Sequence, residues 1–182
     1  MKCIAVTNNP ANGFRAMEMA PDSAVIYRGN PWFMPADGDS AQWSAQIYIG
    51  AVISRLGMNI SPKFAQRYFQ NITIAAHPHN PSADVSLEWL RDGSVIKGDD
   101  ITIDSLPENI AVVADNGQCC SIIKQQIIDS LISAICKASA FVTLKTGDII
   151  LIKADMADFA IAEGADFQIL VNNTPTLKFK TR

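Results

Sequence analysis

The sequence has few charged residues and no long apolar run, and both shortages exclude classes of function. Asp, Glu, Lys and Arg make up 18% of the 182 residues, with a net charge of −3. No basic stripe suits a phosphate backbone, so we expect no nucleic-acid partner. No stretch approaches the ~20 apolar residues that span a bilayer, so we expect no membrane partner. The apolar start ends at Pro10, too early for a signal peptide, which predicts a cytoplasmic protein.

The recognisable chemical motifs are also missing. The four cysteines form no CxxC pair, which favours reduced, mostly buried thiols. Glycine-rich phosphate loops, nucleophile elbows and Ser-His-Asp or Cys-His arrangements are absent. The cysteines are Cys3, Cys119, Cys120 and Cys136. The sequence therefore predicts no catalytic residue of a familiar kind.

What the sequence does contain is core-forming material for one domain, residues 1–182. Its hydrophobic fraction is 48%, enough for a sizeable core. Residues 43–54 alternate strictly between apolar and other side chains, which predicts a strand that packs one face on the core. The core face takes Trp43, Ala45, Ile47, Ile49, Ala51 and Ile53, and the other face includes Gln46 and Tyr48.

The remaining patterns predict more strands than helices. We expect strands at 2–6, 24–27, 72–76, 101–103, 110–114 and 149–152, and a hairpin joining 167–171 to 177–180. Apolar spacing predicts a long helix at about 122–138, and Ser61-Pro62 is typical of the start of a short one. Residues 77–81 contain two prolines, which predicts irregular backbone, and Asp115-Asn116-Gly117 indicates a tight turn. The fold class is α+β, mostly β.

Five segments in order resemble the fumarylacetoacetate hydrolase family, whose members act on 2-oxo acids and diketo acids as hydrolases, isomerases and decarboxylases. The segments are Met1 to Val6 with Asn9, Ala51 to Ser54 with Asn59-Ile60-Ser61, Asp92-Gly93-Ser94, Asn116-Gly117, and Leu144 to Ile150. The last is similar to the family's Leu-x-x-Gly-Asp-Val-Ile motif. The resemblance implies a mixed β-sandwich or roll with a few peripheral helices, assembled as a homodimer.

The positions that carry the family's chemistry differ here. The resemblance implies a Glu-x-Glu pair and an Asp that hold Mg²⁺ or Mn²⁺, and these positions are Gln46, Tyr48 and His77. The family's lysine position is Trp89, its histidine position is Gly13, and its mobile covering segment is shortened to about 81–88. We therefore expect no metal and no cofactor, because an amide, a phenol and an imidazole do not replace three carboxylates.

We thus expect a degenerate, non-catalytic protein of this type, which binds a small molecule or an active relative. Its vestigial ligand pocket takes Arg28, Gln46, Tyr48, His77, His79 and Trp89. Arg28 suits a small carboxylate ligand.

Three other interpretations stay open. A divergent hydrolase or isomerase of a diketo or 2-oxo acid would use a remodelled carboxylate cluster. Its candidate residues are Asp84, Asp92, Asp99 and Asp100. A new zinc site at His77 and His79 is a second interpretation. A purely structural subunit is the third, and it predicts that Trp89 and Tyr48 fill the pocket.

Overall fold

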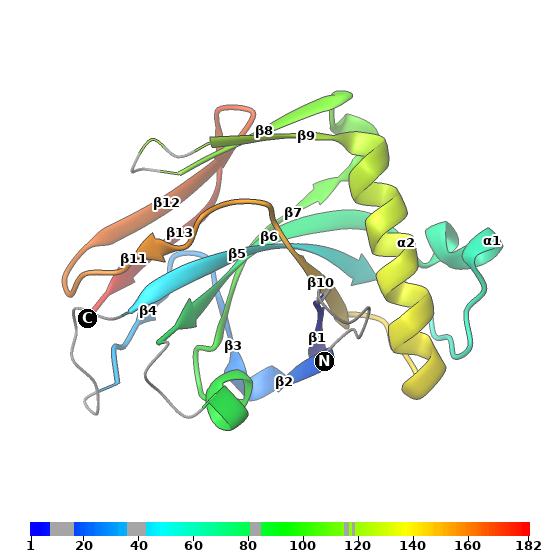
Figure 1. The fold of residues 1–182 in the computed structure, drawn as a ribbon, viewed down its shortest axis with the longest axis horizontal. Coiled ribbons are helices and arrows are strands. Elements are labelled where there is room, and N and C mark those ends of the chain that lie inside the picture. Colours follow the sequence, from blue (N-terminus) through cyan, green and yellow to red (C-terminus); the bar gives the residue numbers. More distant parts are fainter. Residues whose placement is uncertain (8–16, 36–42, 81–84, 115–116, 118) are drawn as a thin grey trace.

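Two β-sheets and one long helix form the body of the protein (Figure 1). The computed structural model describes residues 1–7, 17–35, 43–80, 85–114, 117 and 119–182. Strands outnumber helices, which confirms the α+β, mostly β class. Among the described residues, no helix combines the length and the apolarity that a membrane-crossing segment needs.

The larger sheet has eight strands in the order β2-β1-β10-β5-β6-β7-β3, with β11 paired to β5. Their bounds are β1 Lys2–Val6, β2 Met17–Pro21, β3 Val25–Tyr27, β5 Ser44–Ile53, β6 Phe69–His79, β7 Val95–Thr102, β10 Ile149–Lys153 and β11 Phe159–Ala160. Neighbours are antiparallel except for the parallel pairs β1 with β10 and β3 with β7. The predicted strands at 2–6 and 149–152 are thus confirmed, and the structure shows that they pair with each other.

The smaller sheet has five strands in the order β4-β13-β12-β8-β9. Their bounds are β4 Pro31–Trp32, β8 Asn109–Ala114, β9 Cys119–Ile123, β12 Asp166–Val171 and β13 Thr174–Thr181. The predicted terminal hairpin is confirmed, but its turn is shorter than expected. Asn172 and Asn173 have φ angles of 49° and 66°, so these two residues alone make the turn. Asparagine tolerates this left-handed geometry, which suits the twist of a hairpin.

The main hydrophobic core lies between the two sheets and the helix α2 (Lys124–Phe141). The core face predicted for β5 is confirmed, since all six of its apolar residues are buried there. In Figure 1, α2 runs beside the right-hand part of the large sheet. Helix α1 (Pro62–Ala65) begins after Ser61 as expected and is followed by a 3-10 turn at Gln66–Tyr68. The long helix starts two residues later than predicted, because Ile122 and Ile123 belong to β9.

One prediction about the backbone was wrong. Residues 77–79 are not irregular but continue β6, with His77 and Pro78 paired to Gln46 and Ala45 of β5. Proline is tolerated here because the register of β6 with β7 runs only over 71–76. Among the described strands, only β5 pairs with β6 at Pro78, and a missing N–H is harmless on an open edge. The predicted turn at 115–117 lies outside the described residues except for Gly117.

Candidate functional site

The residues that the resemblance assigns to metal positions come together on the face of the large sheet that points away from α2. Gln46 and Tyr48 project from β5, and His77 lies opposite Gln46 on the neighbouring β6. Side chains two residues apart on a strand share a face, so His79 also lies on this side. Tyr48 belongs to a second apolar cluster, separate from the main core, that includes Cys3, Val95 and Leu151.

Stacked rings fill the centre of this site. Trp89 comes from the 3-10 helix η4 (Val85–Leu90), drawn in green at the bottom of Figure 1. Its indole lies on the imidazole of His77, with centroids 4.0 Å apart and planes at 6°. Tyr48 meets the indole edge-on at 5.5 Å. The exposed fractions of His77, Tyr48 and Trp89 are 2%, 2% and 5%. The three side chains thus pack against one another and are almost closed to solvent.

The Asp92-Gly93-Ser94 turn holds both partners of this stack. The buried Ser94 donates its hydroxyl hydrogen to the Trp89 carbonyl at 2.9 Å, and its own carbonyl lies 2.7 Å from His77 Nδ1. A carbonyl oxygen only accepts, so Nδ1 carries a proton. Gly93 has a φ of +73°, and a Cβ there would lie 2.9 Å from the Trp32 ring. The motif therefore has a structural role: it fixes the stack.

A buried carboxylate joins the two histidines. Glu88 Oε1 lies 2.6 Å from His79 Nδ1 and accepts the backbone N–H of Asn80 at 3.0 Å. Burial alone would raise the pKa of Glu88, but the imidazoles of His77 and His79 and the Asn80 N–H outweigh it and hold that pKa at about 2. The hydrogen bond to Glu88 raises the pKa of His79, although partial burial opposes this. The pair His79–Glu88 is therefore an ion pair over much of the acidic range.

The rim of the site is closed by a chain of polar contacts. Tyr48 donates to Gln46 Oε1 at 3.2 Å, and Gln46 donates to Asp158 Oδ2 at 3.1 Å. Lys153 pairs with the other oxygen of Asp158 at 3.0 Å. Burial, together with nearby acidic groups, raises the pKa of the Tyr48 phenol, so it stays protonated. Gln46 and Tyr48 thus satisfy each other rather than an added ligand.

The partner of Arg28 is an aspartate of β7. Arg28 follows β3 and forms an ion pair with Asp99, whose side chain is 52% exposed. Asp100 pairs with Lys97 on β7, and Asp92 is exposed. Three of the four aspartates proposed for a remodelled site are therefore in surface positions, and Asp84 lies outside the described residues, as does Gly13.

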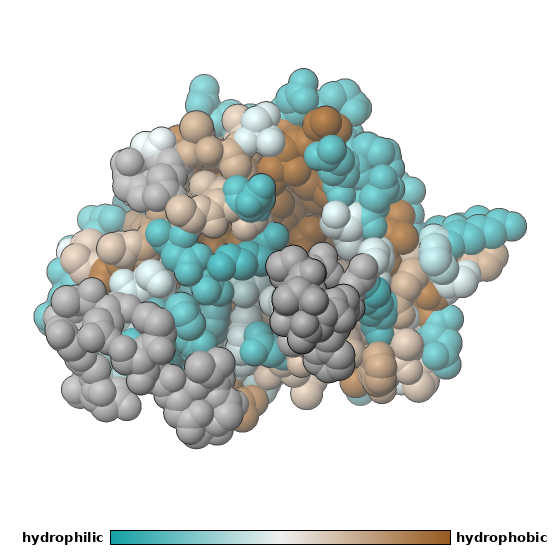
Figure 2. All heavy atoms as spheres, viewed as in Figure 1, coloured by the Kyte–Doolittle hydropathy of each residue, from teal (hydrophilic) through white to brown (hydrophobic). Residues whose placement is uncertain are grey.

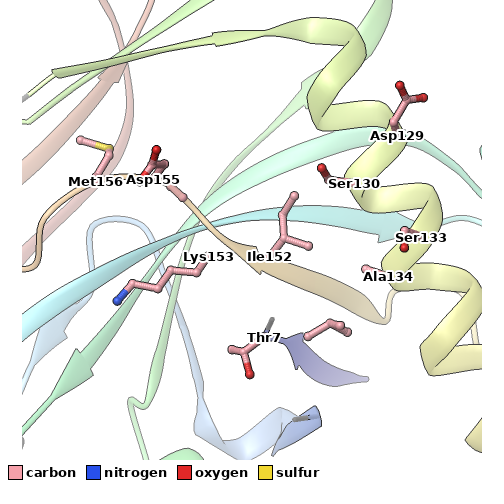
Figure 3. Close-up of a pocket in the computed structure, with 11 residues that line it drawn as sticks. Thr7, Asp129, Ser130, Ser133, Ala134, Ile152, Lys153, Asp155 and Met156 are labelled. Atoms are coloured by element: carbon pink, nitrogen blue, oxygen red, sulfur yellow. The ribbon is translucent and has the colours of Figure 1, made fainter. Parts of the chain in front are cut away.

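An open pocket of about 710 Å³ lies elsewhere, between α2 and the end of β10 (Figure 3). Its lining includes Thr7, Ser130, Ser133, Lys153 and Asp155. Ile152 at its floor packs against the main core, so the pocket is on the opposite face of the sheet from Tyr48. Figure 2 shows apolar side chains gathered between the small sheet and α2, bordered by hydrophilic ones. None of the six predicted pocket residues is among the described residues lining this cavity.

Solved structures with the same fold decide the architecture. The chain superposes on 2-hydroxyhepta-2,4-diene-1,7-dioate isomerase from Mycobacterium marinum with a TM-score of 0.83 and 20% identity, over 99% of this chain and 73% of that one. The chain has the fold of the fumarylacetoacetate hydrolase family. A protein of that family from Yersinia pestis gives 0.80 at 17% identity, covering 100% and 92% of the chains.

A third solved structure with this fold was determined with a metal ion and a small molecule bound. Fumarylpyruvate hydrolase from Pseudomonas aeruginosa, solved with Mn²⁺ and pyruvate, gives a TM-score of 0.79 at 16% identity over 100% of this chain and 89% of that one. No family profile matches the sequence, and no curated protein matches it. The fumarylacetoacetate hydrolase-like fold implied by the resemblance is thus confirmed. At these low identities the comparison shows the fold alone.

Sequence reasoning missed Glu88 as a member of the site. Its number falls within the segment taken as the shortened cover, 81–88, and no periodic pattern marks it. Two facts in the sequence could have indicated Glu88. It directly precedes Trp89, and residues 40–80, which supply the other members of the site, contain no Asp or Glu.

Proposed function

We propose that this chain is a non-catalytic protein of the fumarylacetoacetate hydrolase-like fold, acting as a subunit or binding partner rather than as a hydrolase or isomerase. The stack of Trp89 on His77 carries this proposal. It buries the side chain at the family's aspartate position and leaves 5% of the Trp89 side chain exposed. A substrate would have to displace an indole to reach that position.

The donor set supports the same conclusion, because it does not fit a hard dication. Mg²⁺ and Mn²⁺ favour oxygen ligands, with several carboxylates. The implied ligand positions offer an amide, a protonated phenol and an imidazole. The two carboxylates that reach these side chains are engaged, Glu88 by His79 and Asp158 by Gln46 and Lys153. These side chains therefore do not fit Mg²⁺ or Mn²⁺.

The partner role rests on the resemblance, which implies a homodimer, and an active relative is the other partner that it suggests. A small carboxylate ligand is less favoured, since Arg28 is already paired with Asp99. Light scattering on the eluting protein tests the homodimer directly: a mass of two chains supports it, and a mass of one chain contradicts it. The cytoplasmic location stays a prediction.

The turnover experiment tests the non-catalytic proposal. Purified protein is incubated with Mg²⁺ or Mn²⁺ and a panel of acylpyruvates and oxaloacetate, and loss of substrate absorbance is followed. A fumarylpyruvate hydrolase in the same assay serves as the positive control. We expect the background rate. Metal-dependent turnover that is lost in His77→Ala would overturn the proposal.

One observation favours a second candidate, an enzyme with a remodelled site. His77, His79 and Glu88 lie close enough together to hold a metal ion. The same panel with Zn²⁺ in place of Mn²⁺ tests this candidate, which requires turnover above background.

A further inference from the structure

Three side chains with metal-binding atoms meet where the end of β6 contacts the 3-10 helix η4. They are His77, His79 and Glu88, and one ligand atom from each lies within 4.8 Å of the others. The two histidines come from one face of β6, and the glutamate comes from η4. This cluster goes beyond the proposed partner role, because it concerns a binding site that the role does not require.

The second ring nitrogen of His77 is the observation that calls for a ligand. His77 is 2% exposed, and its Nε2 has no hydrogen-bond partner among the described residues. Its Nδ1 donates to the Ser94 carbonyl, so in the neutral ring the lone pair of Nε2 points outward from the stack. The nearest oxygen of Glu88 is 3.7 Å away, too far for a hydrogen bond. A buried polar atom without a partner is costly, so a cation fits this position.

The surroundings resemble the outer shell of a metal site. A metal-binding histidine usually donates its other N–H to a carbonyl or carboxylate, as His77 does to Ser94. The indole of Trp89 fixes the plane of the same ring. The backbone N–H of Asn80 holds one oxygen of Glu88, which leaves the other oxygen facing His77. The donors are thus oriented before any ion binds.

The distances fit a small ion. A tetrahedral Zn²⁺ with ligand distances of about 2.0–2.1 Å separates its ligand atoms by about 3.3 Å. His79 Nδ1 lies 2.6 Å from Glu88 Oε1 and His77 Nε2 lies 3.7 Å from Glu88 Oε2. The ion would therefore displace the proton between His79 and Glu88, and a small turn of the carboxylate would bring one oxygen to this separation from both rings. Two imidazoles and one carboxylate suit Zn²⁺ and similar transition metals better than Mg²⁺.

We propose that His77, His79 and Glu88 bind one late transition-metal dication, represented by Zn²⁺ and not by the weaker-binding Mn²⁺, and that the ion ties η4 to the end of β6. The side chain of His79 is 21% exposed, which gives the ion a path from solvent and a side on which water completes the coordination. The ion locks Trp89 over the sheet.

The test uses Zn²⁺ on the metal-free full chain, measured by calorimetry, with Co²⁺ as a spectroscopic substitute. We expect one Zn²⁺ per chain with a Kd of about 1 μM or tighter. Glu88→Gln keeps the shape of the side chain and is expected to weaken binding about 100-fold. Glu163→Gln is the matched control, because it makes the same chemical change at an exposed glutamate that precedes β12. It is expected to bind Zn²⁺ like the unaltered chain.

Four outcomes would overturn the proposal. The first is no binding by the unaltered chain at micromolar Zn²⁺. The second and third are an equal loss of Zn²⁺ affinity in both variants and an unchanged Zn²⁺ affinity in Glu88→Gln. The fourth is a thiolate-to-Co²⁺ charge-transfer band, which would place the ion on cysteine. Circular dichroism checks that Glu88→Gln is folded, and His79→Gln replaces it otherwise. Failure here leaves the non-catalytic proposal untouched, because that proposal rests on the stack of Trp89 on His77 and is tested separately by turnover.

Discussion

Replacing Trp89 by alanine removes the ring that covers His77, and we expect it to be one of the most costly substitutions in the protein. An indole buries about 200 Å² of surface, and at about 25 cal/mol per Å² its removal from water is worth about 5 kcal/mol. Trp89 is 5% exposed, so nearly all of this contributes. The alanine methyl and partial collapse of the cavity recover some, so the free energy of unfolding is expected to fall by about 3–5 kcal/mol.

Urea denaturation followed by far-UV circular dichroism measures this loss, since three tryptophans would confuse fluorescence. Leu90→Ala is the matched control: Leu90 is the next residue of η4 and is 54% exposed. We expect the control to change stability by no more than about 0.5 kcal/mol. If Trp89→Ala does not fold, Trp89→Phe keeps one ring on His77 and should lose about half as much.

A loss below about 1 kcal/mol in Trp89→Ala, or an equal loss in Leu90→Ala, would refute the reasoning. Either result would mean that the indole does not fill the site. Space for a ligand would then exist above His77, and the interpretation of a closed site would be wrong.

Three further predictions concern stability and use the same urea assay. Because the pKa of Glu88 is about 2 in the fold against 4.5 ordinarily, its ion pair contributes at most about 3 kcal/mol above pH 4.5, lost as pH falls towards 2. The pKa of His79 is raised from 6.5 in the fold, so the stabilisation that protonated His79 contributes is lost as pH rises through that raised pKa. In metal-free Glu88→Gln, the free energy of unfolding should change less with pH in both the acidic and the neutral range. An unchanged pH dependence would contradict the ion pair between His79 and Glu88. Asp148→Ala should cost about 3 kcal/mol, because the buried carboxylate accepts from the Lys2 and Lys145 backbone N–H groups and from the Lys2 ammonium; a loss under 1 kcal/mol contradicts this. Gly98→Ala should cost about 1–3 kcal/mol, since a Cβ would lie 2.6 Å from the Thr176 carbonyl oxygen; a neutral result would mean that the sheets are not in close contact there.

The sequence predicted the parts of the fold that depend on local periodicity. The alternation over 43–54 set the two faces of β5, and therefore placed Gln46 and Tyr48 away from the main core. The ordered motifs, through their resemblance to the family, implied the architecture that the solved structures confirm. Strands such as β2 and β11 were missed because they are short and are held by their neighbours, so no local pattern marks them.

The site was predicted in part, and the errors have tertiary causes. A pocket filled by Trp89 is what the structural-subunit interpretation predicts, and in the structure the indole of Trp89 lies on His77. Arg28 was placed in the pocket by resemblance, and in the structure its side chain forms an ion pair with Asp99. Glu88 could not be assigned, because its partners His79 and Asn80 are set by how η4 folds against β6. No periodicity encodes that contact.

The most direct test of the central claim is the amplitude of the free Mn²⁺ signal in electron paramagnetic resonance as metal-free protein is added. The claim is that neutral side chains and stacked rings have replaced the family's carboxylate metal site. It predicts that the free-ion signal at submillimolar Mn²⁺ stays constant up to several equivalents of protein. Loss of the signal that saturates at one Mn²⁺ per chain, and that disappears in His77→Ala, would contradict it.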